Sequence, residues 1–183
     1  MSCPSPRPSK TLRFGVGIAA AAVLTAVPAY RAVASAADGT TASDGALDRP
    51  VSPFDEGRPA VDRLDPALLA AVRQATLDAR RDGVEMQLNS GWRSPRHQQH
   101  LLDEAVAEHG PDEARRQVLT PDRSSHVTGE AVDVGPVEAD RWLQRHGTAY
   151  GLCQVYANEI WHFELRTVPG GSCPPQLPDA SAS

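Results

Sequence analysis

The fold is decided by Ser124-Ser125-His126-Val127-Thr128-Gly129-Glu130-Ala131-Val132-Asp133, a stretch that runs into a predicted strand. The alternation from Glu130 to Val134 places Asp133 on one face of that strand, beside Ala131 and opposite its apolar neighbours. Gly129 permits a turn that brings His126 back over the strand, near the Asp133 carboxylate. Imidazole nitrogen and carboxylate oxygen are both zinc ligands. A lone His–Asp pair is also common as a simple polar contact, so this stretch alone does not establish a metal site.

A second segment, Glu159-Ile160-Trp161-His162, follows some thirty residues later. A tight turn at Ala157-Asn158 leads into a predicted strand over 159–165, which pairs antiparallel with a strand over 152–156. The alternation places His162 on one face and sends the apolar residues Trp161, Phe163 and Leu165 to the core. Glu159 precedes this strand, free to lean over the site without binding the metal. Three ligands, an open position and a nearby base are what a mononuclear zinc hydrolase needs.

The remaining periodicity predicts a scaffold around these segments. A helix begins at Asp65-Pro66 and ends at Asp82-Gly83, a strand covers 84–90, and a second helix runs from Ser94-Pro95 to His109-Gly110. A short helix is expected over 112–118, and another from Gly135-Pro136 to Gly147. The fold class is therefore α+β, with a small, mainly antiparallel sheet flanked by three or four helices. Four histidines in or beside these helices are expected at the surface: His97, His100, His109 and His146.

Arg93 stands at the end of a predicted strand, immediately before a helix that carries Gln98 on its inward side. A guanidinium beside a metal could hold a substrate carboxylate or a developing oxyanion. An ion pair of Arg93 with a surface carboxylate is an equally good interpretation of the pattern.

The two ends of the chain are expected to lie outside the folded domain, which is assigned to residues 60–175. Residues 1–36 resemble a signal peptide, with basic residues before an apolar run over 14–30 and Ala34-Ser35-Ala36 as a cleavage site. The alternative is that this segment stays uncleaved and anchors the protein; membrane association is expected only in that case. Residues 37–59 are predicted to be a disordered linker, and residues 176–183 a disordered tail.

Charge and cysteine content limit the function. Without residues 1–36, 14 basic residues face 23 acidic ones, a formal charge of −9. Nucleic acid is therefore excluded as a partner, because phosphate binding needs a basic surface. The remaining chain also has no lysine, which excludes serine carboxypeptidases that use Ser-x-x-Lys. Cys153 and Cys173 are predicted to form a disulfide, as expected outside the cytoplasm; the apolar surroundings of Cys153 argue against a nucleophilic thiol.

The order Ser90-Gly91-Trp92-Arg93-Ser94, then Ser124-x-His126-x-x-Gly129-x-Ala131-x-Asp133, then Glu159-x-Trp161-His162 resembles the VanY-type D-alanyl-D-alanine carboxypeptidases. These belong with lysostaphin-like enzymes and the hedgehog signalling domain, and the resemblance covers roughly residues 60–167. It implies Zn²⁺ bound by three ligands, His126, Asp133 and His162. It also implies Glu159 as general base, Arg93 in catalysis, and substrate contacts from Gln98, Ser124 and Trp161.

The resemblance implies a secreted, cell-wall-associated monomer that removes the terminal D-alanine from peptidoglycan stem peptides. Two features depart from the family pattern. Ile160 stands where proline is usual, and the connection from Tyr150-Gly151 to Glu159 is short, where relatives have a longer hairpin beside the substrate. A peptidoglycan endopeptidase and a zinc-bearing binding module without turnover therefore remain alternatives.

Overall fold

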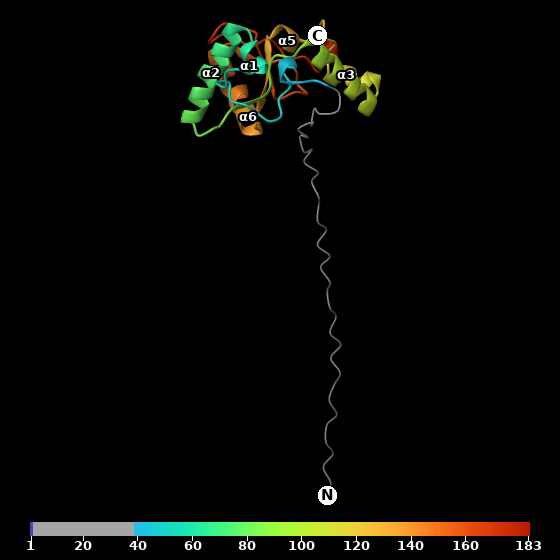
Figure 1. Cartoon of the computed structure of the whole chain (residues 1–183). Helices are drawn as coiled ribbons and strands as arrows, with labels where there is room; N and C mark the ends of the chain where they lie inside the picture. Colours follow the sequence, from blue (N-terminus) through green and yellow to red (C-terminus); the bar gives the residue numbers. More distant parts are fainter. Residues whose placement is uncertain (2–38) are drawn as a thin grey trace. The chain divides into compact units, whose positions relative to one another are not determined.

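The computed structural model describes Met1 and residues 39–183 (Figure 1). The predicted signal peptide and its apolar run, 14–30, lie outside the described residues except for Met1. Among the residues that are described, no helix combines the length and the apolar character needed to cross a membrane.

Four antiparallel strands form one sheet in the order β1-β2-β4-β3, which confirms the α+β prediction. The strands are shorter than the sequence pattern indicated: β1 is Gln87–Ser90, β2 is Ala131–Gly135, β3 is Leu152–Gln154 and β4 is His162–Leu165. β3 ends early because the chain beyond it pairs elsewhere, with Tyr156 in a parallel bridge to Leu177. β4 begins late because residues 159–162 form a turn, in which His162 N donates to Glu159 O at 3.2 Å.

The helices begin and end where capping residues require. The Asp65 side chain accepts from the Ala67 and Leu68 amides at 2.8 and 3.0 Å, and Pro66 opens the helix behind it. Figure 1 shows α2 and α6 at one end of the domain and α3 at the other. The α-helices are α1 (Pro59–Asp62), α2 (Pro66–Arg81), α3 (Pro95–His109), α4 (Pro111–Gln117), α5 (Ser125–Thr128) and α6 (Val137–His146), with short 3-10 turns η1 (Ala42–Asp44), η2 (Gly147–Tyr150) and η3 (Ala180–Ala182).

The two faces of the sheet have different roles. Alternate residues of the central strands, such as Val132 and Phe163, are fully buried in the hydrophobic core. The core also takes in the inner sides of α2 and α6, including Leu68, Val72, Ala75, Ala139, Trp142 and Leu143. The opposite face carries polar side chains, because Asp133 lies directly across from His162 in the β2–β4 register. Cross-strand partners share one face of a sheet, so the register alone brings these two groups together.

The predicted disordered linker is wrong for residues 39–59. Val51 pairs with Leu88 through two backbone hydrogen bonds, of 3.0 and 2.8 Å, and its side chain is buried in the core. Asp44 binds the start of α3 through Ser94 and Arg96. The small and polar residues of this segment cannot form a core of their own, which is why disorder was expected. They are ordered because they form backbone hydrogen bonds with the edge of the sheet and an ion pair with the start of α3.

The predicted disordered tail is wrong as well. Leu177 exchanges backbone hydrogen bonds with Val155 and Ala157 at 2.9 and 2.8 Å, and Asp179 accepts from Arg116 Nε of α4 at 2.9 Å. A disulfide joins Cys153 of β3 to Cys173, as the cysteine count indicated. Closing a loop of this size stabilises the folded state by about 3 kcal/mol in the chain-entropy picture.

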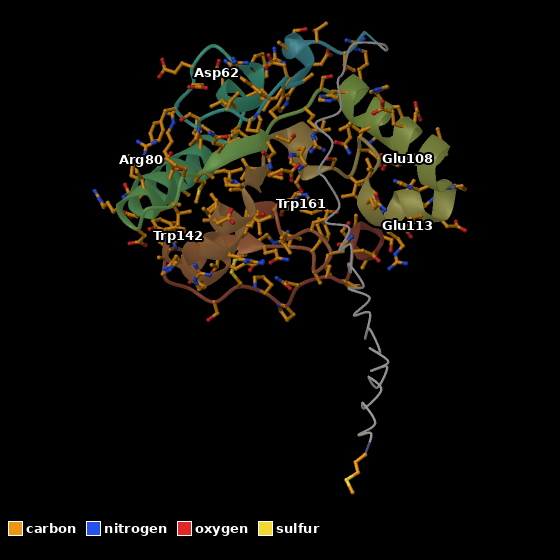
Figure 2. All side chains as sticks on the ribbon, turned by 90° about the horizontal axis from the view of Figure 1, so that it is seen from below. Asp62, Arg80, Glu108, Glu113, Trp142 and Trp161 are labelled. Atoms are coloured by element: carbon orange, nitrogen blue, oxygen red, sulfur yellow. A yellow bond between two sulfur atoms is a disulfide. The ribbon has the colours of Figure 1, made fainter. Side chains whose placement is uncertain are left out.

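Two side chains lie where the sequence did not place them. His97 is buried rather than at the surface, because its Nδ1 lies 3.2 Å from Asp44 O in the segment that was expected to be disordered. Trp161 does not belong to the hydrophobic core. It is half-buried, and Figure 2 shows it between Trp142 of α6 and Glu113 of α4.

Asp140 of α6 is a buried carboxyl group whose Oδ1 receives no hydrogen bond from the described residues. Burial, with the charges of Asp133 and Glu138, raises its pKa to about 7. The folded state therefore binds a proton more tightly than the unfolded chain, and stability falls as pH rises from about 4 to 7.

The variant Asp140→Asn removes this penalty. We expect it to raise the free energy of unfolding of the metal-free protein by about 1–3 kcal/mol at pH 8 and to change it little near pH 4. Urea unfolding at both pH values measures the effect. Glu138→Gln, an exposed neighbour, should stay within about 0.5 kcal/mol; an equal gain in both variants would show that only net charge matters.

Candidate metal centre

Two histidines and one aspartate converge on one point at the polar face of the sheet. Nε2 of His126 lies 3.3 Å from Nδ1 of His162 and 3.3 Å from Oδ1 of Asp133, and the last two atoms are 3.2 Å apart. All three side chains are buried. A tetrahedral ion with ligands at about 2.0–2.1 Å needs ligand atoms about 3.3 Å apart.

The hydrogen-bond partners of the two rings determine which nitrogen can bind a metal. His126 Nδ1 donates to Gly91 O at 2.8 Å, so Nε2 keeps the lone pair. His162 Nε2 donates to Glu164 Oε1 at 3.1 Å, which leaves the lone pair on Nδ1. When both rings are neutral, three lone pairs point at one another, and a cation relieves that repulsion. The donor set fits a mononuclear metal.

Local backbone explains how His126 reaches the site. It lies in α5, which ends at Gly129 with φ +81°, a left-handed conformation that favours glycine. Space requires glycine too, because a Cβ there would lie 2.4 Å from Arg63 O. The predicted chain reversal at Gly129 is therefore present, and it directly follows the single-turn helix α5.

The charges at the site favour an ionised aspartate. The nearby His126, His162 and Arg93 outweigh burial and hold the pKa of Asp133 well below its usual range. Burial lowers the pKa of His162, but the carboxylates of Asp133 and Glu164 outweigh that effect and raise it to about 9. Because a ligating imidazole must be neutral, binding a metal at neutral pH releases a proton.

Glu159 lies beside the metal ligands but outside their triangle. Its Oε2 is 3.9 Å from His162 Nδ1, and its Oε1 is buried without a hydrogen-bond partner among the described residues. Burial, with the negative charge of Asp133, raises its pKa to about 7. A carboxyl group whose pKa is near the working pH can both take up and give back a proton.

Arg93 is a partner of the ligand carboxylate. Its Nη2 donates to Asp133 Oδ2 at 2.6 Å, its Nε to Ser90 Oγ at 2.8 Å, and its Nη1 to Gln98 Oε1 at 3.1 Å. Gln98 in turn donates to Leu119 O at 2.8 Å. The surface interpretation of Arg93 is therefore wrong: its side chain is 13% exposed and lies against the site.

Ser124 and Trp161 flank the ligands in the chain without touching them by hydrogen bonds. Ser124 is buried at the start of α5, where its carbonyl accepts from Val127 N at 3.0 Å. The Trp161 carbonyl accepts from Val134 N at 2.9 Å, and its ring lies outside the core. Their roles as substrate contacts stay predictions.

Glu164 is the residue that the sequence analysis missed. It accepts from His162 with one oxygen and from Arg166 with the other, at 3.1 Å each, and it is buried. The signal was present in the alternation of β4, because residues two apart in a strand share a face. Such a carboxylate orients the histidine and increases its affinity for a metal.

Removing the Glu164 charge should therefore weaken metal binding. We expect Glu164→Gln to lower zinc affinity by about 10- to 100-fold, measured by competition with a chromophoric chelator. Glu85→Gln, an exposed glutamate paired with Arg80 at 3.6 Å, is the matched control and should bind zinc as the wild type does. Unchanged affinity in Glu164→Gln would mean that His162 is held by packing alone.

Fold and site together define an α+β domain with one mononuclear metal centre. Residues 61–166 match the sequence model of the VanY family, described as D-alanyl-D-alanine carboxypeptidase. The chain belongs to this family, as the motifs predicted.

Relatives with names and structures support the assignment. A D-alanyl-D-alanine carboxypeptidase of Enterococcus faecalis is 32% identical over an alignment of 111 residues, and the match covers 46% of this chain and 41% of that protein. This chain thus spans less than half the length of that relative. The solved structure of VanYB in complex with D-alanine-D-alanine gives a TM-score of 0.53 at 28% identity, over 55% of this chain and 70% of that one. A mutant of the D,D-pentapeptidase VanY from a VanB-type resistance cassette, in complex with Zn(II), gives a TM-score of 0.55 at 25% identity, over 63% and 77%.

Proposed function

We propose that this chain is a zinc-dependent carboxypeptidase that removes the terminal D-alanine from peptidoglycan stem peptides. The observation that carries the proposal is the convergence of three ligand atoms beside the buried carboxyl group of Glu159, whose Oε1 receives no hydrogen bond from the described residues. Family membership and the D-alanine-D-alanine ligand of the VanYB structure support the choice of substrate.

Zinc would be held by His126, Asp133 and His162, with one coordination position left for water or substrate. When bound, it supplies Lewis acidity, which polarises a peptide carbonyl and lowers the pKa of water toward 7. Glu159 accepts the proton of the attacking water and then delivers it to the nitrogen of the departing D-alanine. The buried position of Glu159 suits both steps.

Arg93, which is hydrogen-bonded to Asp133, would contribute positive charge beside the substrate. A guanidinium has more N–H groups than the three that Arg93 uses within the protein, so it can also hold a substrate carboxylate or the developing oxyanion. Gln98 keeps the guanidinium in place, and Ser124 and Trp161 are proposed to contact the peptide.

The proposal extends to the setting of the enzyme. Residues 1–36 would direct export, and the catalytic domain over 60–175 would act as a monomer outside the cytoplasm, at the cell wall. The disulfide Cys153–Cys173 suits an oxidising compartment. The folded domain is larger than this range, because residues 39–59 and 176–183 pack onto it.

A second candidate is an endopeptidase that cuts within the stem or cross-bridge. It is favoured by the short connection over 152–158, where β3 is followed directly by the turn that carries Glu159. With less chain beside the substrate, a longer or branched peptide could reach the metal.

Mass spectrometry of peptide products distinguishes these functions. The purified zinc-loaded protein is incubated with a stem pentapeptide that ends in D-Ala-D-Ala, and with the same peptide ending in L-Ala. Loss of one alanine from the first peptide alone supports the proposal. Cleavage inside the peptide supports the endopeptidase, and no change in any peptide, with zinc bound, would indicate a binding module and overturn the proposal.

A further inference from the structure

Residues 39–52, here called the N-terminal strap, lie outside the region that matches the family, 61–166, and pack beside the turn that carries Arg93. The strap is anchored at one end by the two hydrogen bonds of Val51 to Leu88 of β1. Further along, Gly45 lies against the backbone of Trp92 so closely that a Cβ there would be 2.0 Å from its carbonyl oxygen. The strap is thus fitted to the turn.

Asp44 makes most of the polar contacts between the strap and α3. Its Oδ1 accepts from Ser94 Oγ at 2.8 Å, and its carboxylate forms an ion pair with Arg96. Its backbone oxygen accepts from Ser94 N at 2.9 Å and lies 3.2 Å from His97 Nδ1. Ser94 is the N-cap of α3, whose Oγ accepts from His97 N at 3.1 Å, so Asp44 holds the capping residue itself.

The Asp44 carboxylate is a permanent charge at this position. The Arg96 guanidinium and the hydroxyl of Ser94 hold its pKa well below the usual range. Its side chain is only 13% exposed. The contact therefore persists over the whole physiological pH range.

The turn that Asp44 fastens carries several site contacts. Gly91 O accepts from the ligand His126, Arg93 N donates to His126 O at 3.1 Å, and the Arg93 side chain reaches Asp133. Gln98, which holds Arg93, is in the first turns of α3, and its backbone N–H donates to Ser94 O at 3.0 Å. A shift of Ser94 would therefore move Arg93 and Gln98 together.

We propose that Asp44 is a positioning residue for the peptidase reaction: through Ser94 and Arg96 it sets the place of the Arg93–Gln98 pair beside the metal ligands. The inference rests on the proposed function, since positioning has meaning only for a site that turns over. Because a misplacement of about 1 Å at a catalytic group can cost up to about 100-fold in rate, the strap is a working part of the enzyme.

Kinetics of matched variants test the inference. We expect Asp44→Ala to lower kcat/KM by about 10-fold or more, at full zinc content and well below the melting temperature. The kcat/KM of Asp44→Asn should lie between those of the wild type and Asp44→Ala, because the asparagine amide oxygen still accepts from Ser94. Asp48→Ala is the control: it removes the same charge from the same strap, where the side chain is 78% exposed and 3.8 Å from Arg58, and it should match the wild type.

A readout without turnover completes the test. The Nε–H of Arg93, which is held by Ser90 Oγ, can be followed by ¹⁵N NMR and assigned with Arg93→Lys. Its exchange with solvent should speed up in Asp44→Ala and stay unchanged in Asp48→Ala. An active wild type with an equally active Asp44→Ala overturns the positioning role, even if exchange changes. An inactive wild type with zinc bound overturns the proposed function instead.

Discussion

Glu159→Gln is expected to retain zinc and to lose at least about 100-fold in kcat on a stem peptide ending in D-Ala-D-Ala. The amide cannot accept the proton of water, and it has no proton to return to the departing amine. The metal ligands do not change, because Glu159 lies 3.9 Å from His162 Nδ1 and outside the ligand triangle. Product release followed by mass spectrometry, with zinc content measured on the same sample, checks both statements.

Loss of fold would not explain such a result. Burial raises the pKa of Glu159 to about 7, so its charged form is unfavourable in the folded protein, and a neutral amide removes that cost. Glu108→Gln, whose side chain is 78% exposed on α3, is the control and should keep full activity. Activity of Glu159→Gln within a few-fold of wild type would refute its assignment as base.

Local signals were enough to predict most of the scaffold. Asp65-Pro66 and Ser94-Pro95 are capping sequences whose effect depends only on the next few residues, and both helices begin there. The alternation around Asp133 and His162 correctly assigned each to the polar face of its strand. The register that sets them opposite each other depends on pairing between distant segments, so it came from the family resemblance and from the structure.

The strap and the tail could not be predicted, for the same physical reason. Asp44 and Asp179 lie in short polar stretches with no periodicity, and each pairs with an arginine remote in sequence, Arg96 or Arg116. Composition reports whether a segment can form its own core. It does not report whether a finished domain offers the segment hydrogen bonds and ion pairs.

The site shows the same division. The three candidate ligands could be named from residue type and spacing, whereas the group that supports His126 could not, because it belongs to the backbone. Gly91 O fixes the tautomer of His126, and any residue at that position has a carbonyl oxygen. Glu164 was the exception, since its alternation with His162 could have been noticed.

His126→Ala is expected to lower zinc affinity by at least about 100-fold and to abolish measurable turnover at equimolar zinc. Binding of structural zinc by four ligands is worth about 10–16 kcal/mol, so losing one ligand costs about 3 kcal/mol, or two orders of magnitude. The remaining Asp133 and His162 cannot enclose the ion, and Arg93 then repels it at short range. Competition with a chelator gives the affinity, and elemental analysis gives the bound metal.

The loss must be separated from loss of structure, because His126 is buried and its Nδ1 holds Gly91 O. His126→Gln has an amide of similar reach, and it should fold even if the alanine variant does not, while binding zinc equally poorly. His109→Ala, at the exposed end of α3, should bind zinc as the wild type does. If the folded His126 variants kept zinc at wild-type affinity, the ion would be bound elsewhere, and the convergence of three potential ligand atoms at 3.2–3.3 Å would need another explanation.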